Sequence, residues 1–144
     1  MVGVELNMVV KDSLKALELY ENIFDIKRME VSNFPRGENE VVFTLYDVHL
    51  HMLDENPKFH LIAPSPDDPK TSWVNVTVPD ILETYTKAMD LGCTEVQPVT
   101  EMADYGVSNA IFMDPFGYVW MLHQVHKKVS HEERIRLWEE KRED

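Results

Sequence analysis

The sequence is poor in cysteine, in basic residues and in long apolar runs. Its single cysteine, Cys93, cannot form a disulfide within the chain, which favours a reducing, cytoplasmic setting. Lys and Arg number 14 against 26 Asp and Glu, for a formal net charge of −12. This charge repels phosphate backbones and anionic lipids, so we expect neither a nucleic-acid partner nor a membrane surface. No stretch reaches the roughly 20 apolar residues of a membrane span.

An internal repeat organises the chain. The segment "LNMVVKDSLKALELYENIFDIKRMEV" from Leu6 aligns without a gap to "VNVTVPDILETYTKAMDLGCTEVQPV" from Val74, with Asn7 over Asn75 and Asp12 over Asp80. The proline-rich "APSPDDPKTS" between the copies is typical of a linker. We predict one domain over residues 1–144, with modules at about 1–63 and 73–126 and a linker at about 64–72.

Periodicity predicts the elements of each module. Strands are expected near residues 4–10, 27–32, 40–46 and 48–53, and again near 73–78, 95–99, 107–113 and 118–123. Asp12 and Asp80 are good N-caps for one helix in each module. A third helix, capped by Ser130, is expected over about 130–142. The prediction is an α+β fold of two β-α-β-β-β modules, each with a curved mixed sheet.

Four of the strands separate an apolar face, suited to helix packing, from an unusual mixed face. The mixed faces combine one carboxylate, two amides, three histidines, an indole and a thioether: Glu5, Asn7, His49, His51, Trp73, Asn75, Met121 and His123. Lys and Arg, common on strands that face water, are missing from this set. We interpret the set as the lining of a ligand pocket, and the alternative is a wet sheet face or a dimer contact.

Two other segments have simpler interpretations. "DPFG", which contains Asp114 and Gly117, predicts a turn before the last strand. The expected third helix carries Ile135 and Trp138 on one side among many charges, and this stripe is interpreted as a docking seam. His60 lies in an expected loop and is taken as incidental.

The modules, the opening "NMVVKDSLKALELYENIFD" and the close "MDPFGYVWML" resemble the vicinal oxygen chelate superfamily, which includes glyoxalase I, bleomycin-resistance proteins and extradiol dioxygenases. "DPFGYVW" followed by "HKKVSHEER" resembles its PhnB-like branch. The resemblance covers nearly the whole chain. It implies a sheet-lined cavity and a homodimer in which a cavity can combine modules from two chains.

The resemblance also locates the metal ligands of the metal-dependent members, one on the first and one on the last strand of each module. These positions are Glu5, His51, Trp73 and Met121 here. Only Glu5 and His51 are of a type that serves a divalent metal. The quartet is therefore incomplete and glyoxalase I activity is not expected. A metal on Glu5 and His51, with or without His49, is kept as the alternative.

The function expected from the resemblance is that of a PhnB-like protein that binds a small molecule in its cavity. A carboxylate beside an imidazole favours the charged form of the ring, so Glu5 could hold His51 as a cation for an anionic or carbonyl-bearing ligand. No Arg or Lys clamp for a phosphonate lies in the inferred pocket. The alternative is a metal-dependent lyase, isomerase or dioxygenase-like enzyme acting on a small oxygenated metabolite. No catalytic residue is assigned.

Overall fold

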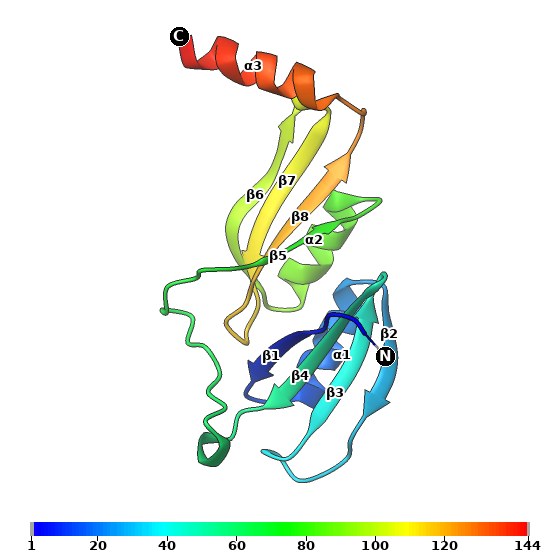
Figure 1. Cartoon of the computed structure of the whole chain (residues 1–144), viewed down its shortest axis with the longest axis vertical. Helices are drawn as coiled ribbons and strands as arrows, with labels where there is room; N and C mark the ends of the chain where they lie inside the picture. Colours follow the sequence, from blue (N-terminus) through cyan, green and yellow to red (C-terminus); the bar gives the residue numbers. More distant parts are fainter. Residues whose placement is uncertain (1, 144) are drawn as a thin grey trace. The chain divides into compact units, whose positions relative to one another are not determined.

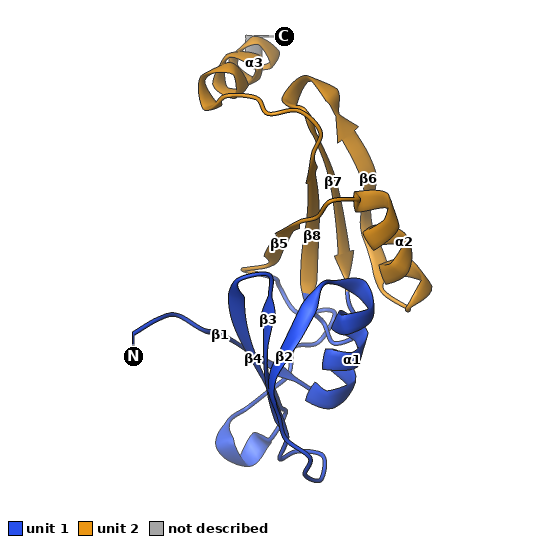
Figure 2. Ribbon diagram, turned by 90° about the vertical axis from the view of Figure 1, so that its right-hand side faces the viewer, with its two compact units in different colours: residues 1–70, 114–118 blue, residues 71–113, 119–144 orange. Residues whose placement is uncertain are grey.

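A computed structural model describes residues 2–143 and divides the chain into two compact units (Figure 2). The first unit comprises the residues up to Lys70 together with Asp114–Tyr118, and the second comprises Thr71–Met113 and the residues from Val119 onward. Each unit contains one β-α-β-β-β module, so the predicted α+β fold is confirmed. None of the helices in residues 2–143 has the length and apolar character needed to cross a lipid bilayer.

The first unit is a four-stranded mixed sheet with one helix (Figure 1). Its elements are β1 (Leu6–Val10), α1 (Ser13–Ile23), β2 (Ile26–Val31), β3 (Glu40–Leu45) and β4 (Val48–Asp54). The strand order is β1-β4-β3-β2, in which β1 runs parallel to β4 and the other pairs are antiparallel. A short 3₁₀ turn at Pro57–Phe59 follows the sheet.

The second unit repeats this arrangement. Its elements are β5 (Val74–Thr77), α2 (Ile81–Asp90), β6 (Thr94–Met102), a 3₁₀ turn at Ala103–Tyr105, β7 (Val107–Met113), β8 (Val119–Val125) and α3 (His131–Glu143). The order β5-β8-β7-β6 matches that of the first sheet, with β5 parallel to β8. The Ser130 hydroxyl accepts a hydrogen bond from the Glu133 N–H at 3.2 Å, which confirms the predicted cap of α3.

The repeat extends to the caps of the first two helices. Asp12 accepts from the Lys15 N–H and Asp80 accepts from the Glu83 N–H, both at 3.1 Å. Such a bond satisfies one of the N–H groups that a helix start leaves without a partner. The two predicted N-caps are therefore confirmed.

The repeat also extends to how each helix is attached to its sheet. The Ser13 N–H, at the start of α1, donates to Asp54 Oδ1 at 2.7 Å. The Ile81 N–H, at the start of α2, donates to Gln124 Oε1 at 2.8 Å. In both modules a side-chain oxygen near the end of the last strand thus anchors the first turn of the helix.

The predicted apolar faces form the cores of the two units. The most deeply buried apolar side chains include Val10, Leu17, Tyr20, Phe43, Leu50 and Met52 in the first unit, and Ala110, Phe112, Trp120 and Leu122 in the second. Strand alternation puts Leu6 on the same face as Met8 and Val10, but Leu6 is 47% exposed. It is the first residue of β1, where the strand is only beginning.

The "DPFG" segment forms the predicted turn. The Asp114 N–H donates to the Tyr118 carbonyl at 2.9 Å, and Asp114 Oδ1 accepts from the Phe116 and Tyr118 N–H groups at 2.8 and 3.1 Å. Gly117 has φ +91°, and a Cβ there would lie 2.9 Å from the Pro64 carbonyl oxygen. Only glycine suits both the left-handed backbone and the close approach.

Candidate functional site

The open face of the first sheet lies opposite its buried face and carries most of the polar groups of the site. Strand alternation and register place on it three side chains from each of three neighbouring strands: Glu5, Asn7 and Val9; His49, His51 and Leu53; Glu40, Val42 and Thr44. Glu5 itself immediately precedes β1. His49 and His51 share this face because they are two residues apart on one strand.

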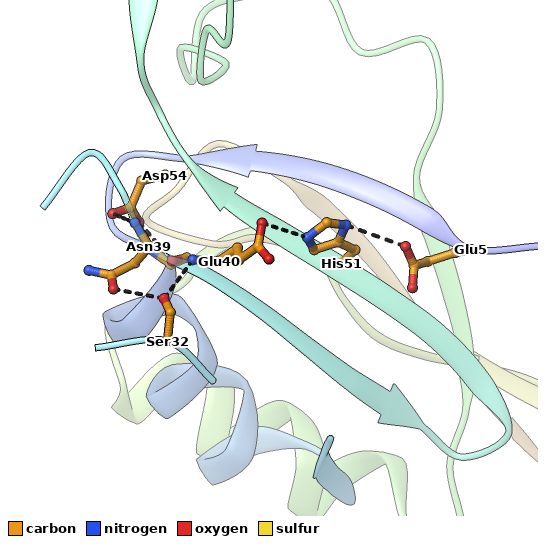
Figure 3. Close-up of polar contacts among 7 residues, drawn as sticks. Glu5, Ser32, Asn39, Glu40, His51 and Asp54 are labelled. Carbon is orange, nitrogen blue, oxygen red and sulfur yellow. Dashed lines mark hydrogen bonds and ion pairs between the residues drawn. The ribbon is translucent and has the colours of Figure 1, made fainter. Parts of the chain in front are cut away.

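His51 lies at the centre of this face, between two carboxylates (Figure 3). Its Nδ1 is 3.3 Å from Glu5 Oε1 and its Nε2 is 3.5 Å from Glu40 Oε2. The imidazole is only 20% exposed, whereas the Glu5 and Glu40 side chains are 40% and 57% exposed. We refer to these three residues as the His51 cluster.

Glu40 was not among the residues selected from the sequence. In the antiparallel pair of β3 and β4, Val42 lies opposite His51, so Glu40 is a diagonal neighbour on the same face. The signal for it was the short connection between two adjacent predicted strands, which the structure shows to be the two residues Tyr46 and Asp47. A two-residue connection sets the register of a hairpin. Applying that register to the sequence brings Glu40 to His51.

The His51 cluster has an acidic balance. A protonated imidazole between two carboxylates leaves a net charge of −1, and a neutral imidazole leaves −2. Both ring nitrogens of His51 face a carboxylate, and the buried Nε2, at 3.5 Å from Glu40, makes no hydrogen bond within residues 2–143. An anionic ligand would therefore have to displace Glu5 or Glu40, whereas a cation or a hydrogen-bond donor can join the cluster directly.

The donor set does not fit the divalent metal of the metal-dependent relatives. The two ring nitrogens of His51 point in different directions, and Glu5 faces one of them while Glu40 faces the other. A single metal ion bound to one ring nitrogen could therefore not be coordinated by both carboxylates. Trp73 has only an N–H to donate, and Met121 is a soft, weak ligand. Across residues 2–143, no three His, Cys, Asp or Glu side chains are grouped so that they could hold a metal ion.

The open face of the second sheet is more apolar. Its side chains come from β5 and the residue before it, from β8 and from β7: Trp73, Asn75 and Thr77; Val119, Met121 and His123; Val107, Asn109, Ile111 and Met113. Trp73 is 58% exposed. The strands β5 to β8 contain neither Lys nor Arg. This face therefore lacks a positive charge of its own for an anionic ligand.

One polar network crosses this second face. His123 Nδ1 is 2.6 Å from Asn109 Oδ1, and the Asn109 amide nitrogen donates to the Met102 sulfur at 3.2 Å. Asn109 and Met102 were not predicted from the sequence, because their proximity to His123 depends on the pairing of β6, β7 and β8. Of the eight residues predicted to line the pocket, four lie on the open face of the first sheet and four on that of the second.

A cavity of about 280 Å³ lies in the first unit, beside Glu40. Its walls include Glu40, Leu53, Asp54, Phe59 and Leu61. No sequence signal pointed to this cavity, because it forms between the end of the sheet and the loops around residues 37–39 and 56–61. It extends the ligand-accessible surface next to the His51 cluster.

The carboxylate of Asp54 in the wall of this cavity is a structural group. It accepts hydrogen bonds from the Ser13 N–H and hydroxyl at 2.7 Å, the Gly37 N–H at 2.9 Å and the Asn39 N–H at 3.0 Å. Burial raises the pKa of Asp54, but these hydrogen bonds lower it by more, so that the pKa lies below its ordinary value. The residue is a stable anion that holds the loop and α1 to the sheet.

Two β-α-β-β-β modules, each with a helix on one side of a mixed sheet and a polar cluster on the other, define a class of paired-module proteins. The family model for the Glyoxalase/Bleomycin resistance protein/Dioxygenase superfamily matches residues 4–122, and the chain belongs to this superfamily. None of the curated protein sequences compared with the chain is a significant match.

Solved structures share the fold at low sequence identity. The fosfomycin resistance protein FosX from Listeria monocytogenes, in complex with Mn(II) and a sulfate ion, has a TM-score of 0.68 at 16% identity, over 96% of this chain and 98% of that one. The PhnB protein from Bacillus cereus has a TM-score of 0.65 at 14% identity, over 86% and 100%. TioX from Micromonospora sp. ML1 has a TM-score of 0.62 at 14% identity, over 90% and 100%. The fold resemblance predicted from the sequence is confirmed.

Proposed function

We propose that this chain is a PhnB-like, metal-independent protein that binds a small molecule on the open faces of its sheets. The observation that carries the proposal is the His51 cluster, a sheltered imidazole between Glu5 and Glu40 on a face that a folded module leaves uncovered. The proposal assigns Glu5, Asn7, His49, His51 and Glu40 to ligand binding on the open face of the first sheet, and Trp73, Asn75, Met121 and His123 to ligand binding on the open face of the second. A ligand with a cationic or hydrogen-bond-donating group suits this cluster best.

The first test is the metal content and the glyoxalase I activity of the purified protein. With Trp73 and Met121 in two ligand positions, we expect no stoichiometric Zn, Ni, Mn or Fe before metal is added. We also expect no appreciable turnover of the methylglyoxal–glutathione adduct, with or without added Ni or Zn. Elemental analysis and a spectrophotometric assay measure both. Stoichiometric metal with robust turnover would instead support the alternative, a metal-dependent lyase, isomerase or dioxygenase-like enzyme.

The second test concerns His51 directly. His51→Ala is expected to weaken binding of a ligand identified by thermal-shift screening by about tenfold or more, because it removes the imidazole that holds the Glu5 and Glu40 carboxylates in position for the ligand. A hydrogen bond to such a charged group contributes about 1.5–3 kcal/mol. Calorimetric titration measures the affinity, and a thermal melt shows that the fold is retained.

The matched control is His60, which is exposed and lies in the turn after Pro57–Phe59. Its φ is +61°, a conformation that asparagine tolerates, so His60→Asn is the suitable variant. It should leave both affinity and melting unchanged. Equal affinities for the two variants would remove His51 from the site.

The proposal also includes a homodimer. The superfamily resemblance implies one, and α3 exposes Ile135 and Trp138 by 44% and 59%. Sedimentation velocity at tens of micromolar should show a species of twice the mass of the chain. A single monomeric species at that concentration would contradict the dimer without affecting the expected role of His51.

A further inference from the structure

We propose that Asn109 and Met102 hold His123 in one tautomer, in which its Nε2 accepts a hydrogen bond. We further propose that the second sheet binds an apolar part of a ligand that carries a hydrogen-bond donor. The statement about the tautomer stands on the second unit alone. The statement about the ligand rests on the proposed function, because it names the chemistry of the molecule bound there.

The orientation of the Asn109 amide follows from its contact with Met102. A thioether sulfur has no hydrogen to donate, so the group that faces it at 3.2 Å must be the amide nitrogen. The amide oxygen then faces His123 Nδ1 at 2.6 Å. Because this oxygen can only accept, Nδ1 must carry the hydrogen.

The remaining nitrogen of the ring is left as an acceptor. A neutral imidazole carries one hydrogen, so a protonated Nδ1 gives Nε2 a free lone pair. His123 is half-buried, and its Nε2 makes no hydrogen bond to any group within residues 2–143. The network thus presents one oriented acceptor on the open face of the second sheet.

The side chains around His123 favour a ligand that is apolar apart from its hydrogen-bond donor. Met121 lies two residues away on the same face of β8, and Ile111 is its register partner on β7. On this face Val119 pairs with Met113. Since β5 to β8 contain no Lys or Arg, a lone pair among apolar side chains repels an anion and favours a neutral hydroxyl or N–H group. An apolar or aromatic molecule with a hydroxyl group has this chemistry.

The tautomer can be measured on the full chain by side-chain ¹⁵N NMR at roughly pH 8.5, above the range in which histidine normally changes charge. The His123 spectrum should show a protonated Nδ1 and an unprotonated Nε2. Asn109→Leu should remove this preference, whereas Asn109→Asp should keep it, because a carboxylate also accepts from Nδ1–H. Asn75→Leu, a change of another amide on the same face, is the control and should leave the His123 tautomer unchanged. An Nε2-protonated ring in the unmodified protein, or no change in Asn109→Leu, would overturn the proposal.

The ligand class is tested with two probes of nearly equal shape, 4-methylphenol and 4-methylanisole. Only the phenol can donate to Nε2, so it should shift the His123 resonances and bind about fivefold more tightly, as expected for one neutral hydrogen bond. The preference should disappear in His123→Phe. If His123 has the expected tautomer but the protein shows no preference for the phenol, the proposed ligand class is wrong. The broader proposal of ligand binding is tested separately by the His51 variants.

Discussion

Replacing Asp54 with alanine is expected to lower the free energy of unfolding by about 3–5 kcal/mol, because several buried donors lose a charged acceptor at once. Asp54 is only 2% exposed and joins α1 to the loop at Gly37 and Asn39. Urea denaturation followed by circular dichroism measures the loss. The matched control is Asp12→Ala, which removes a more exposed N-cap and should cost about 1 kcal/mol. Equal losses in the two variants would contradict the anchoring role of Asp54.

The same variant has a defined dependence on pH. Burial raises the pKa of Asp54, but its hydrogen bonds outweigh burial and the pKa in the folded protein lies below the ordinary value. A carboxyl group of this kind contributes stability above its unfolded pKa of about 3.9, and the contribution is lost as the pH falls through the folded pKa. The stability difference between the unmodified protein and Asp54→Ala should therefore be largest near neutral pH and shrink in acid below about pH 4. A difference that stays constant into acid would show that the charge of Asp54 is not what stabilises the fold.

Trp120→Ala is expected to destabilise the protein by about 3–5 kcal/mol, whereas Trp73→Ala should cost less than about 1 kcal/mol. The two residues are of the same type and lie in the same unit, but Trp120 is fully buried at 0% exposure and Trp73, just before β5, is 58% exposed. Removing Trp120 leaves a cavity in the core of the second unit, and removing Trp73 leaves only solvent.

Thermal and urea denaturation of the two tryptophan variants measure this contrast. The Trp73 variant should retain its stability and lose affinity for the ligand instead, since Trp73 lies on the open face. Similar stability losses would mean that the second sheet does not separate its faces as the alternation of residues indicates.

Most of the secondary structure could be predicted from local pattern. The N-caps Asp12, Asp80 and Ser130 confirm the expected helix starts. The boundaries were less accurate: β1 begins at Leu6, later than expected, and β6 extends to Met102 instead of ending near residue 99. β6 is an edge strand with shifts in register on either side of Gln97, and a local pattern does not show how far such a strand pairs with its neighbour.

The candidate site could be predicted only in part. Glu5 and His51 were selected from alternation, and in the structure Glu5 Oε1 lies 3.3 Å from His51 Nδ1. The other partner of His51, Glu40, was missed, as was the Asn109 and Met102 network at His123. The second carboxylate at His51 was not expected, and the binding of an anionic or carbonyl-bearing ligand by His51 stays a prediction.

The amino-acid sequence by itself determined the two-module repeat, the helix starts and the face of each strand on which a side chain lies. These features depend on residues that are close together in the chain, through the periods of about 3.6 for helices and 2 for strands. Only the tertiary structure decided which side chains meet across strands, such as Glu40 with His51 and Asn109 with His123. Such contacts depend on strand order and register, and a change of one residue in register would move every partner to the opposite face.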